Sequence, residues 1–239
     1  MGPDLFYKIG NNYKIILVPF FLAVTLSGCV SLQKPPCKIT PVPPPALGTL
    51  YNPIIDSNIT LTEALRKYAP VALKRKQRLV EVLYYSFDAK VHKGQIVVDY
   101  RLVKDIQQVF KVILETRFPV KSVIPVSHDR FCRDGVYNSD GLSMRLNNTS
   151  GFNYRKVTGG KNLSMHAYGF ALDINPLQNP YIKGRVILPR GAIYDPARLG
   201  TLTRNSAVTK TFIRLGWTWG GNWKSLKDYQ HFEKVLDKY

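Results

Sequence analysis

The 239-residue chain is poor in cysteine and in acidic residues. Its three cysteines, Cys29, Cys37 and Cys132, are too few and too far apart for a disulfide framework or for the paired spacing of a zinc knuckle. Only 16 Asp and Glu residues stand against 34 Lys and Arg, which leaves a net charge of +18. This surplus favours anionic surroundings such as wall polymers, lipid headgroups or nucleic acid, and does not choose among them.

Apolar runs long enough to cross a bilayer are also absent. The run 15–26 is interrupted by Pro19, and as a helix it covers about 18 Å, short of the roughly 20 residues that a membrane span requires. Lys8 and Lys14 precede this run. The pattern predicts a signal peptide over residues 1–28, with an uncleaved anchor as the alternative.

The residues that end this segment, Leu26-Ser27-Gly28-Cys29, resemble the bacterial lipobox. The resemblance predicts that Cys29 is lipidated and becomes the mature N-terminus. The chain is therefore expected to be an exported lipoprotein, anchored in a membrane and facing the periplasm or the cell wall. Because export separates the chain from chromosomal DNA, peptidoglycan and phospholipid become the expected partners and nucleic acid does not.

Proline dominates the segment that follows. Residues 29–57 contain seven prolines and are predicted to form an extended, semi-rigid tether. If Cys29 is lipidated, Cys37 and Cys132 are the two thiols that remain. An oxidising compartment either pairs them or leaves both reduced, and the sequence leaves both outcomes open.

The first helix signal follows the tether. Thr60-x-x-Glu63 has the form of a capping box. Apolar residues then recur at helical spacing until Pro70, which predicts a helix of two or three turns.

Beyond this helix the residue pattern changes between strand and helix. Segments 79–87 and 95–100 are rich in β-branched and aromatic residues, which predicts a hairpin whose connection contains Gly94. Apolar spacing predicts a helix over 102–116, and segment 120–126 is predicted to be a strand. The mixture predicts an α+β domain with a small, largely antiparallel sheet and flanking helices.

The sharpest chemical feature is the stretch 164–173, SMHAYGFALD, which contains two types of metal ligand, His166 and Asp173. Its second half alternates apolar residues with Ala171 and Asp173, as a strand does. A separation of seven residues would place His166 and Asp173 on opposite faces of one unbroken strand. The two side chains can therefore converge only if the chain turns at Tyr168-Gly169.

A second cluster near the C-terminus contains Asp228 and His231. Together, His166, Asp173 and His231 form a two-histidine, one-carboxylate set that suits zinc with its fourth position open. Zinc acidifies water, and Asp228 is the carboxylate left to accept the proton. The other two histidines are interpreted as structural: His92 and His128.

At these residues the chain resembles the zinc D-alanyl-D-alanine carboxypeptidases and L-alanyl-D-glutamate endopeptidases, which cut peptidoglycan stem peptides. The pattern Ser-x-His-x-x-Gly-x-Ala-x-Asp is complete, and the likeness extends from about Phe118 to Phe232. The resemblance implies a hedgehog/DD-peptidase-like fold with Zn2+ as cofactor. It also implies a zinc peptidase domain over residues 58–239, with its motif-bearing core at 118–239.

The resemblance further implies a role for each site residue. Zinc is held by His166, Asp173 and His231, and Asp228 is the catalytic base. An arginine is expected near the scissile carbonyl, where its positive charge stabilises the oxyanion. Arg155 is the predicted arginine and Arg145 the alternative. Ser164 is expected to help position the metal ligands without binding the metal itself.

The choice between the two activities stays open. The carboxypeptidases commonly have Glu-x-x-His, whereas this chain has Asp228-x-x-His231 as the endopeptidases do, which tilts the interpretation slightly to endopeptidase. Three tryptophans are expected either to line the cleft or, more commonly for Trp, to lie in the core: Trp217, Trp219 and Trp223.

The predicted function is thus that of a zinc metallopeptidase acting on peptidoglycan stem peptides. Two alternatives remain. One is a non-catalytic cell-wall-binding lipoprotein on the same fold, and the other is a zinc hydrolase acting on an amide outside the wall.

Overall fold

A computed structural model describes residues 45–66, 69–132 and 140–236. The predicted signal peptide, the predicted lipidation site Cys29 and most of the predicted tether lie outside the described residues. Cys37 lies outside them as well, so both outcomes for Cys37 and Cys132, paired or reduced, stay open. Among the helices of the described residues, none is long and apolar enough to span a membrane.

The folded part begins inside the segment predicted to be a tether. Strand β1 (Ile54–Ile55) pairs in parallel with β3, and the Ser57 hydroxyl donates to the Gln95 side chain at 2.7 Å. Residue 58, expected as the start of the domain, therefore follows the first strand. The reason is that the prolines end at Pro53, so the residues after it are free to pair as a strand.

The capping box is confirmed. The Thr60 hydroxyl accepts from the Glu63 amide at 3.2 Å, and the Glu63 carboxylate accepts from the Thr60 amide at 2.7 Å. The helix that it starts, α1 (Leu61–Ala64), is a single turn, so the expected length of two or three turns is wrong. A second short helix, α2 (Val71–Lys76), starts directly after Pro70.

The hairpin is confirmed, but its turn lies elsewhere. Strands β2 (Gln77–Tyr85) and β3 (Val91–Asp99) pair antiparallel, and the connection is residues 86–90. Gly94 lies inside β3, opposite Val82. A Cβ at Gly94 would overlap the carbonyl oxygen of Val123, so the glycine permits a close crossing of two chain segments instead of making the turn.

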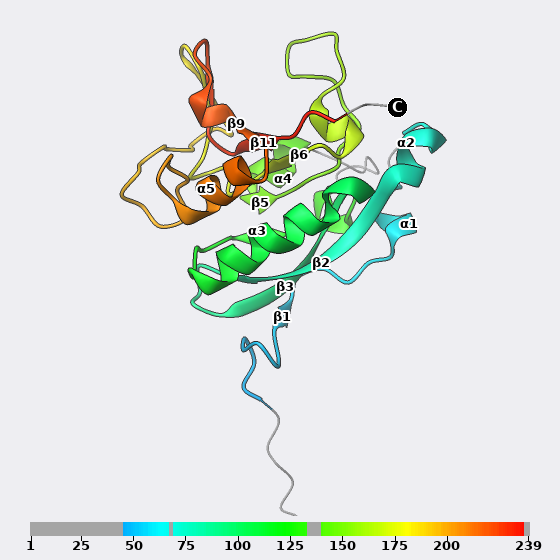
Figure 1. Cartoon of the computed structure of the whole chain (residues 1–239), viewed down its shortest axis with the longest axis vertical. Coiled ribbons are helices and arrows are strands. Elements are labelled where there is room, and N and C mark those ends of the chain that lie inside the picture. Colours follow the sequence, from blue (N-terminus) through cyan, green and yellow to red (C-terminus); the bar gives the residue numbers. More distant parts are fainter. Residues whose placement is uncertain (1–44, 67–68, 133–139, 237–239) are drawn as a thin grey trace, which may run out of the picture. The chain divides into compact units, whose positions relative to one another are not determined.

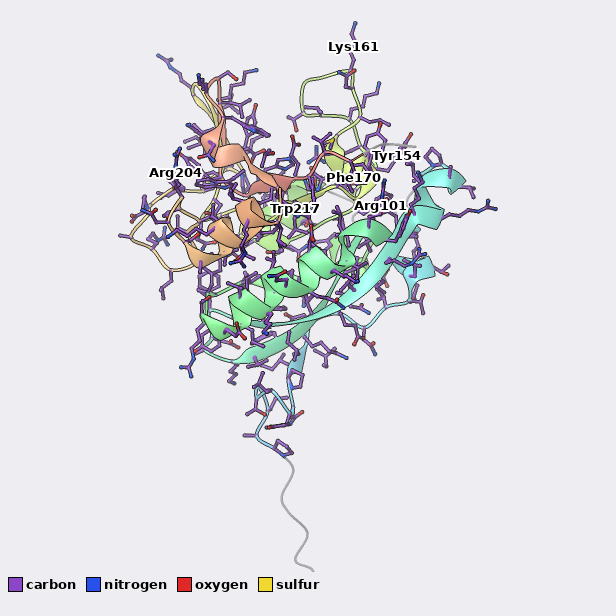
Figure 2. The ribbon with its side chains drawn as sticks, in the orientation of Figure 1. Arg101, Tyr154, Lys161, Phe170, Arg204 and Trp217 are labelled. Atoms are coloured by element: carbon purple, nitrogen blue, oxygen red, sulfur yellow. The ribbon has the colours of Figure 1, made fainter. Side chains whose placement is uncertain are left out.

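The main core forms where helices cover this hairpin. Helix α3 (Val103–Glu115), predicted over 102–116, lies along the hairpin, with α5 (Ala207–Arg214) beside it (Figure 1). Figure 2 labels Trp217 in the interior, where its indole nitrogen donates to Asp105 of α3 at 2.9 Å. The core side chains that α3 and α5 bury include Ile106, Val109, Phe110, Ile113, Val208 and Phe212.

The remaining strands form small sheets in place of one. β4 (Ser122–Val123) pairs in parallel with β5 (Asn148–Thr149), so only Ser122 and Val123 of the predicted strand 120–126 belong to a strand. Two three-stranded antiparallel sheets follow. They are made of β6 (Ala171–Asp173), β11 (His231–Glu233) and β9 (Thr218–Trp219), and of β10 (Lys227–Asp228), β7 (Tyr181–Lys183) and β8 (Val186–Leu188).

The α+β class is therefore confirmed, with several small sheets among the described residues. The other helical elements are one short α-helix and four single 3₁₀ turns: α4 (Asp140–Arg145), η1 (Tyr100–Leu102), η2 (Asp129–Phe131), η3 (Met165–Tyr168) and η4 (Gly220–Asn222).

Candidate metal centre

Three side chains from two distant parts of the chain meet at one end of the β6–β11 pair. Asp173 on β6 lies directly opposite His231 on β11 in the antiparallel register. His166 comes from the 3₁₀ helix η3, which ends at Gly169 in the left-handed conformation, with φ of 74°. The predicted turn is thus confirmed, and it returns His166 to the face that Asp173 occupies.

The donor atoms of these residues are close enough to share one cation. His166 Nε2 lies 3.2 Å from Asp173 Oδ2 and 3.2 Å from His231 Nδ1, and His231 Nδ1 lies 3.0 Å from Asp173 Oδ1. All three side chains are buried. A tetrahedral ion with ligands at about 2.0–2.1 Å separates those ligands by roughly 3.3 Å, so the observed spacing suits a metal.

The outer nitrogens of both rings are already engaged. His166 Nδ1 lies 2.7 Å from the Gly151 carbonyl, and His231 Nε2 lies 3.0 Å from the Glu233 carboxylate. Both partners can only accept a hydrogen bond, so these outer nitrogens carry the hydrogen. In the neutral rings the inner nitrogens, His166 Nε2 and His231 Nδ1, then present lone pairs to each other. Two lone pairs facing each other at 3.2 Å repel unless a cation or proton lies between them, so the donor set fits a metal ion.

The charges favour the same conclusion. Burial alone would raise the pKa of Asp173, but His166 and His231 outweigh it and hold the pKa well below its usual range. For His231, burial lowers the pKa, and the hydrogen bonds to Asp173 and Glu233 reverse this and raise it to about 10. The site therefore attracts positive charge strongly, and His231 holds a proton when no other cation competes for it.

Asp228 lies beside these ligands on β10. Burial, opposed by His231 and assisted by the negative charge of Asp173, raises the pKa of Asp228 to about 6. The Gln230 side chain donates to Asp228 Oδ1 at 3.2 Å. A Cβ at Gly220 would overlap the Asp228 carbonyl oxygen, so the glycine allows η4 to pack against the strand that carries Asp228.

Of the two candidate arginines, Arg155 has another partner in this structure. Arg155 Nε lies 2.9 Å from Asp140 Oδ2, and the same carboxylate accepts from the Asn153 side chain at 2.9 Å. Arg145 is exposed at the end of α4. Within the described ranges, no hydrogen bond or ion pair joins either arginine to the three ligands or to Asp228, so the choice between them stays a prediction.

The remaining residues singled out in the sequence divide between core and site. Trp217 and Trp219 are buried in the core, whereas Trp223 is half-buried with its ring 5.5 Å from the ring of His231. The Ser164 hydroxyl accepts from the His166 amide at 3.3 Å and so caps η3. Its contact is with the backbone of the ligand and not with the imidazole ring.

Two groups that orient the ligands, Glu233 and the Gly151 carbonyl, were not predicted from the sequence. Glu233 had a signal, because residues two apart on a strand share a face and Glu233 is two residues after His231. The Gly151 carbonyl had none, since a backbone acceptor leaves no mark in the residue pattern.

Comparison with known proteins agrees with this site. Residues 158–234 match the family model described as D-alanyl-D-alanine carboxypeptidase. No curated protein and no solved structure matches the chain. The matched stretch contains His166, Asp173, His231 and Asp228, and does not reach Arg155. Residues 158–234 are therefore similar to the D-alanyl-D-alanine carboxypeptidase family of peptidases, and they contain a buried His-Asp-His set that can hold a metal ion.

Proposed function

We propose that the chain is a zinc-dependent metallopeptidase that cleaves peptidoglycan stem peptides, on a hedgehog/DD-peptidase-like fold. It acts either as a D-alanyl-D-alanine carboxypeptidase or as an L-alanyl-D-glutamate endopeptidase. The observation that carries the proposal is the buried donor set with a carboxylate of raised pKa beside it, all within the stretch that matches the family.

Zinc is the metal that the donors suit best. Two imidazole nitrogens and one carboxylate oxygen are ligands that zinc prefers, and three protein ligands leave a fourth position for water or substrate. When bound, zinc supplies a Lewis acid that polarises a carbonyl and acidifies water. His166, Asp173 and His231 would hold it.

Asp228 is the group that moves the proton in this proposal. As a carboxylate it accepts a proton from the attacking water and then donates that proton to the departing amine. A pKa of about 6 suits both roles, because it lies near the pH at which the proton must be taken and returned. Gln230 orients the carboxylate through its hydrogen bond to Oδ1.

Arg155 is proposed to stabilise the oxyanion, with Arg145 as the alternative. One contact supports the choice of Arg155. Its backbone carbonyl accepts a hydrogen bond from the Ser164 amide at 3.0 Å, so its backbone lies beside the residue that caps η3. In this structure its guanidinium pairs with Asp140. Loss of kcat on Arg155→Ala but not on Arg145→Ala would support this choice, and the reverse would favour Arg145.

Membrane attachment is a separate part of the proposal. The lipobox-like residues before Cys29 and the net charge of +18 support an exported lipoprotein, held on a membrane through Cys29 and facing the periplasm or cell wall. Mass spectrometry of the N-terminal peptide tests this directly. Diacylglycerol on Cys29 is the expected result, and an unmodified Met1 terminus would contradict it.

The activity is tested by mass spectrometry of purified peptidoglycan fragments incubated with the zinc-loaded full-length chain. Loss of a terminal D-alanine indicates the carboxypeptidase, and cleavage between L-alanine and D-glutamate indicates the endopeptidase. Asp228→Asn is expected to be inactive, and Asp129→Asn, an exposed aspartate paired with Arg66, serves as the matched control. Unchanged fragments with zinc bound stoichiometrically would contradict the peptidase proposal and leave a non-catalytic cell-wall-binding lipoprotein.

A further inference from the structure

A second polar pocket lies at the turn end of the β2–β3 hairpin and has no part in the proposed reaction. Its volume is about 340 Å³, at the lower end of the range for small-molecule sites. Neither the three candidate metal ligands nor Asp228 line it. The lining residues with polar side chains are Asp56, Ser86, Asp88, His92, Lys121, Ser122 and Arg130.

One part of the lining is a hydrogen-bonded chain of acidic and aromatic side chains. His92 Nδ1 lies 3.0 Å from Asp56 Oδ2, and His92 Nε2 lies 3.1 Å from Asp88 Oδ2. The Tyr84 hydroxyl also donates to Asp56. Burial raises the pKa of Tyr84, so this hydroxyl stays protonated and keeps its role as donor.

The two carboxylates differ in what they can still accept. The Asp56 side chain is 14% exposed, and one of its oxygens serves both His92 and Tyr84. Asp88 also has partners, because His92 Nε2 lies within 3.2 Å of both its oxygens and Oδ1 accepts from the Lys90 amide at 3.1 Å. Its side chain is nevertheless 46% exposed, in the turn at the edge of the pocket, and each carboxylate oxygen can accept a second hydrogen bond. Asp88 is therefore the carboxylate available to a ligand.

Two cations line the same pocket. Lys121 and Arg130 are exposed, and in the part of the chain that the structure describes neither side chain forms a hydrogen bond or an ion pair. Neighbouring Arg66, by contrast, pairs with Asp129 at 2.6 Å. Lys121 and Arg130 thus present positive charge to the pocket that no described carboxylate neutralises by contact.

We propose that this pocket binds the zwitterionic form of a free amino acid. The ligand carboxylate lies at Arg130 and Lys121, and its ammonium group lies at Asp88. A purely anionic ligand would meet the Asp88 carboxylate, and a purely cationic one would meet the two basic side chains. Only a ligand with both charges matches both parts of the lining.

The test is a titration of the zinc-loaded, 15N-labelled full-length chain followed by NMR, with three probes. D-alanine carries both charges, D-alaninamide only the ammonium group, and N-acetyl-D-alanine only the carboxylate. Saturable shifts at the amides of Ser86, His92 and Ser122 are expected for D-alanine, with affinity at least about tenfold higher than for either analogue. Equal affinity for all three probes would overturn the proposal.

Two variants separate this pocket from the metal centre. Arg130→Gln is expected to lower the affinity for D-alanine about tenfold, whereas Arg214→Gln, which removes an exposed charge at the end of α5, is expected to leave it unchanged. Shifts confined to the amides near His166 and His231 would mean that D-alanine binds only at the metal centre, which would overturn the proposal. The result is independent of whether the chain cleaves stem peptides.

Discussion

Zinc and a proton are expected to compete for His231. The carboxylates of Asp173 and Glu233 raise the pKa of His231 to about 10, so near neutral pH the metal-free ring is protonated. The Asp173 carboxyl is ionised at the same pH, because its pKa lies well below its usual range. Zinc binding must therefore displace at least one proton, from His231.

The size of the pH effect on zinc affinity follows from this proton count. Below pH 10, each unit of pH changes the fraction of deprotonated His231 about tenfold, equivalent to about 1.4 kcal/mol of zinc-binding free energy. Zinc affinity should therefore rise at least about tenfold from pH 6 to pH 7 and again from pH 7 to pH 8. Zinc affinity rises with pH because the raised pKa of His231 favours its protonated form, which cannot bind zinc, at low pH.

Competition with a chromophoric chelator measures the affinity at each pH, and calorimetry in buffers of different ionisation enthalpy counts the protons released. Glu233→Gln removes one of the carboxylates that raise the pKa of His231, so the pH above which zinc affinity stops rising should move below about 10. Glu81→Gln changes an exposed glutamate on β2 and should leave that pH unchanged. Zinc affinity independent of pH, with no proton released, would show that zinc displaces no proton from His231.

Three further outcomes are expected. Asp228→Asn should lower kcat by about 10²- to 10⁴-fold because the proton acceptor is lost, while chelator competition should give unchanged zinc stoichiometry; loss of zinc would contradict its role as base. Gly169→Ala should lower the free energy of unfolding in urea by about 1–3 kcal/mol, because φ is positive and the new Cβ overlaps the Gln77 side chain. Gly184→Ala, at positive φ in open space, should lower it by less. Equal losses of stability would contradict the overlap at Gly169. Phe212→Ala should cost about 3–5 kcal/mol in the same assay because its buried ring stacks on Phe232 and meets Trp217 edge-on; a cost below 1 kcal/mol would show that the core is not packed as described.

The features predicted well from the sequence depend on neighbouring residues. Helix α3 follows from apolar spacing along one segment, and the η3 turn follows from Gly169 between a histidine and an alternating strand. The metal-ligand set was predicted from ligand chemistry and not from neighbouring residues. His231 is 58 residues from Asp173, and the two were grouped because both side chains are common zinc ligands.

The features predicted poorly depend on contacts between distant segments. Gly94 is a residue type common in turns, but here it allows the close approach of Val123, which no local sequence pattern reveals. The ion-pair partner of Arg155 is likewise distant in sequence. Asp140 is fifteen residues before it, and nothing in the spacing indicates that the two side chains pair.

The central claim is that a zinc ion held by His166, Asp173 and His231 is required for stem-peptide cleavage. The most direct measurement is the mass-spectrometric cleavage assay after zinc is removed with a chelator and then restored at one equivalent. Removal of zinc is expected to abolish cleavage, one equivalent of zinc to restore it, and His166→Ala to show no recovery. Cleavage that persists in the zinc-free chain would contradict the claim.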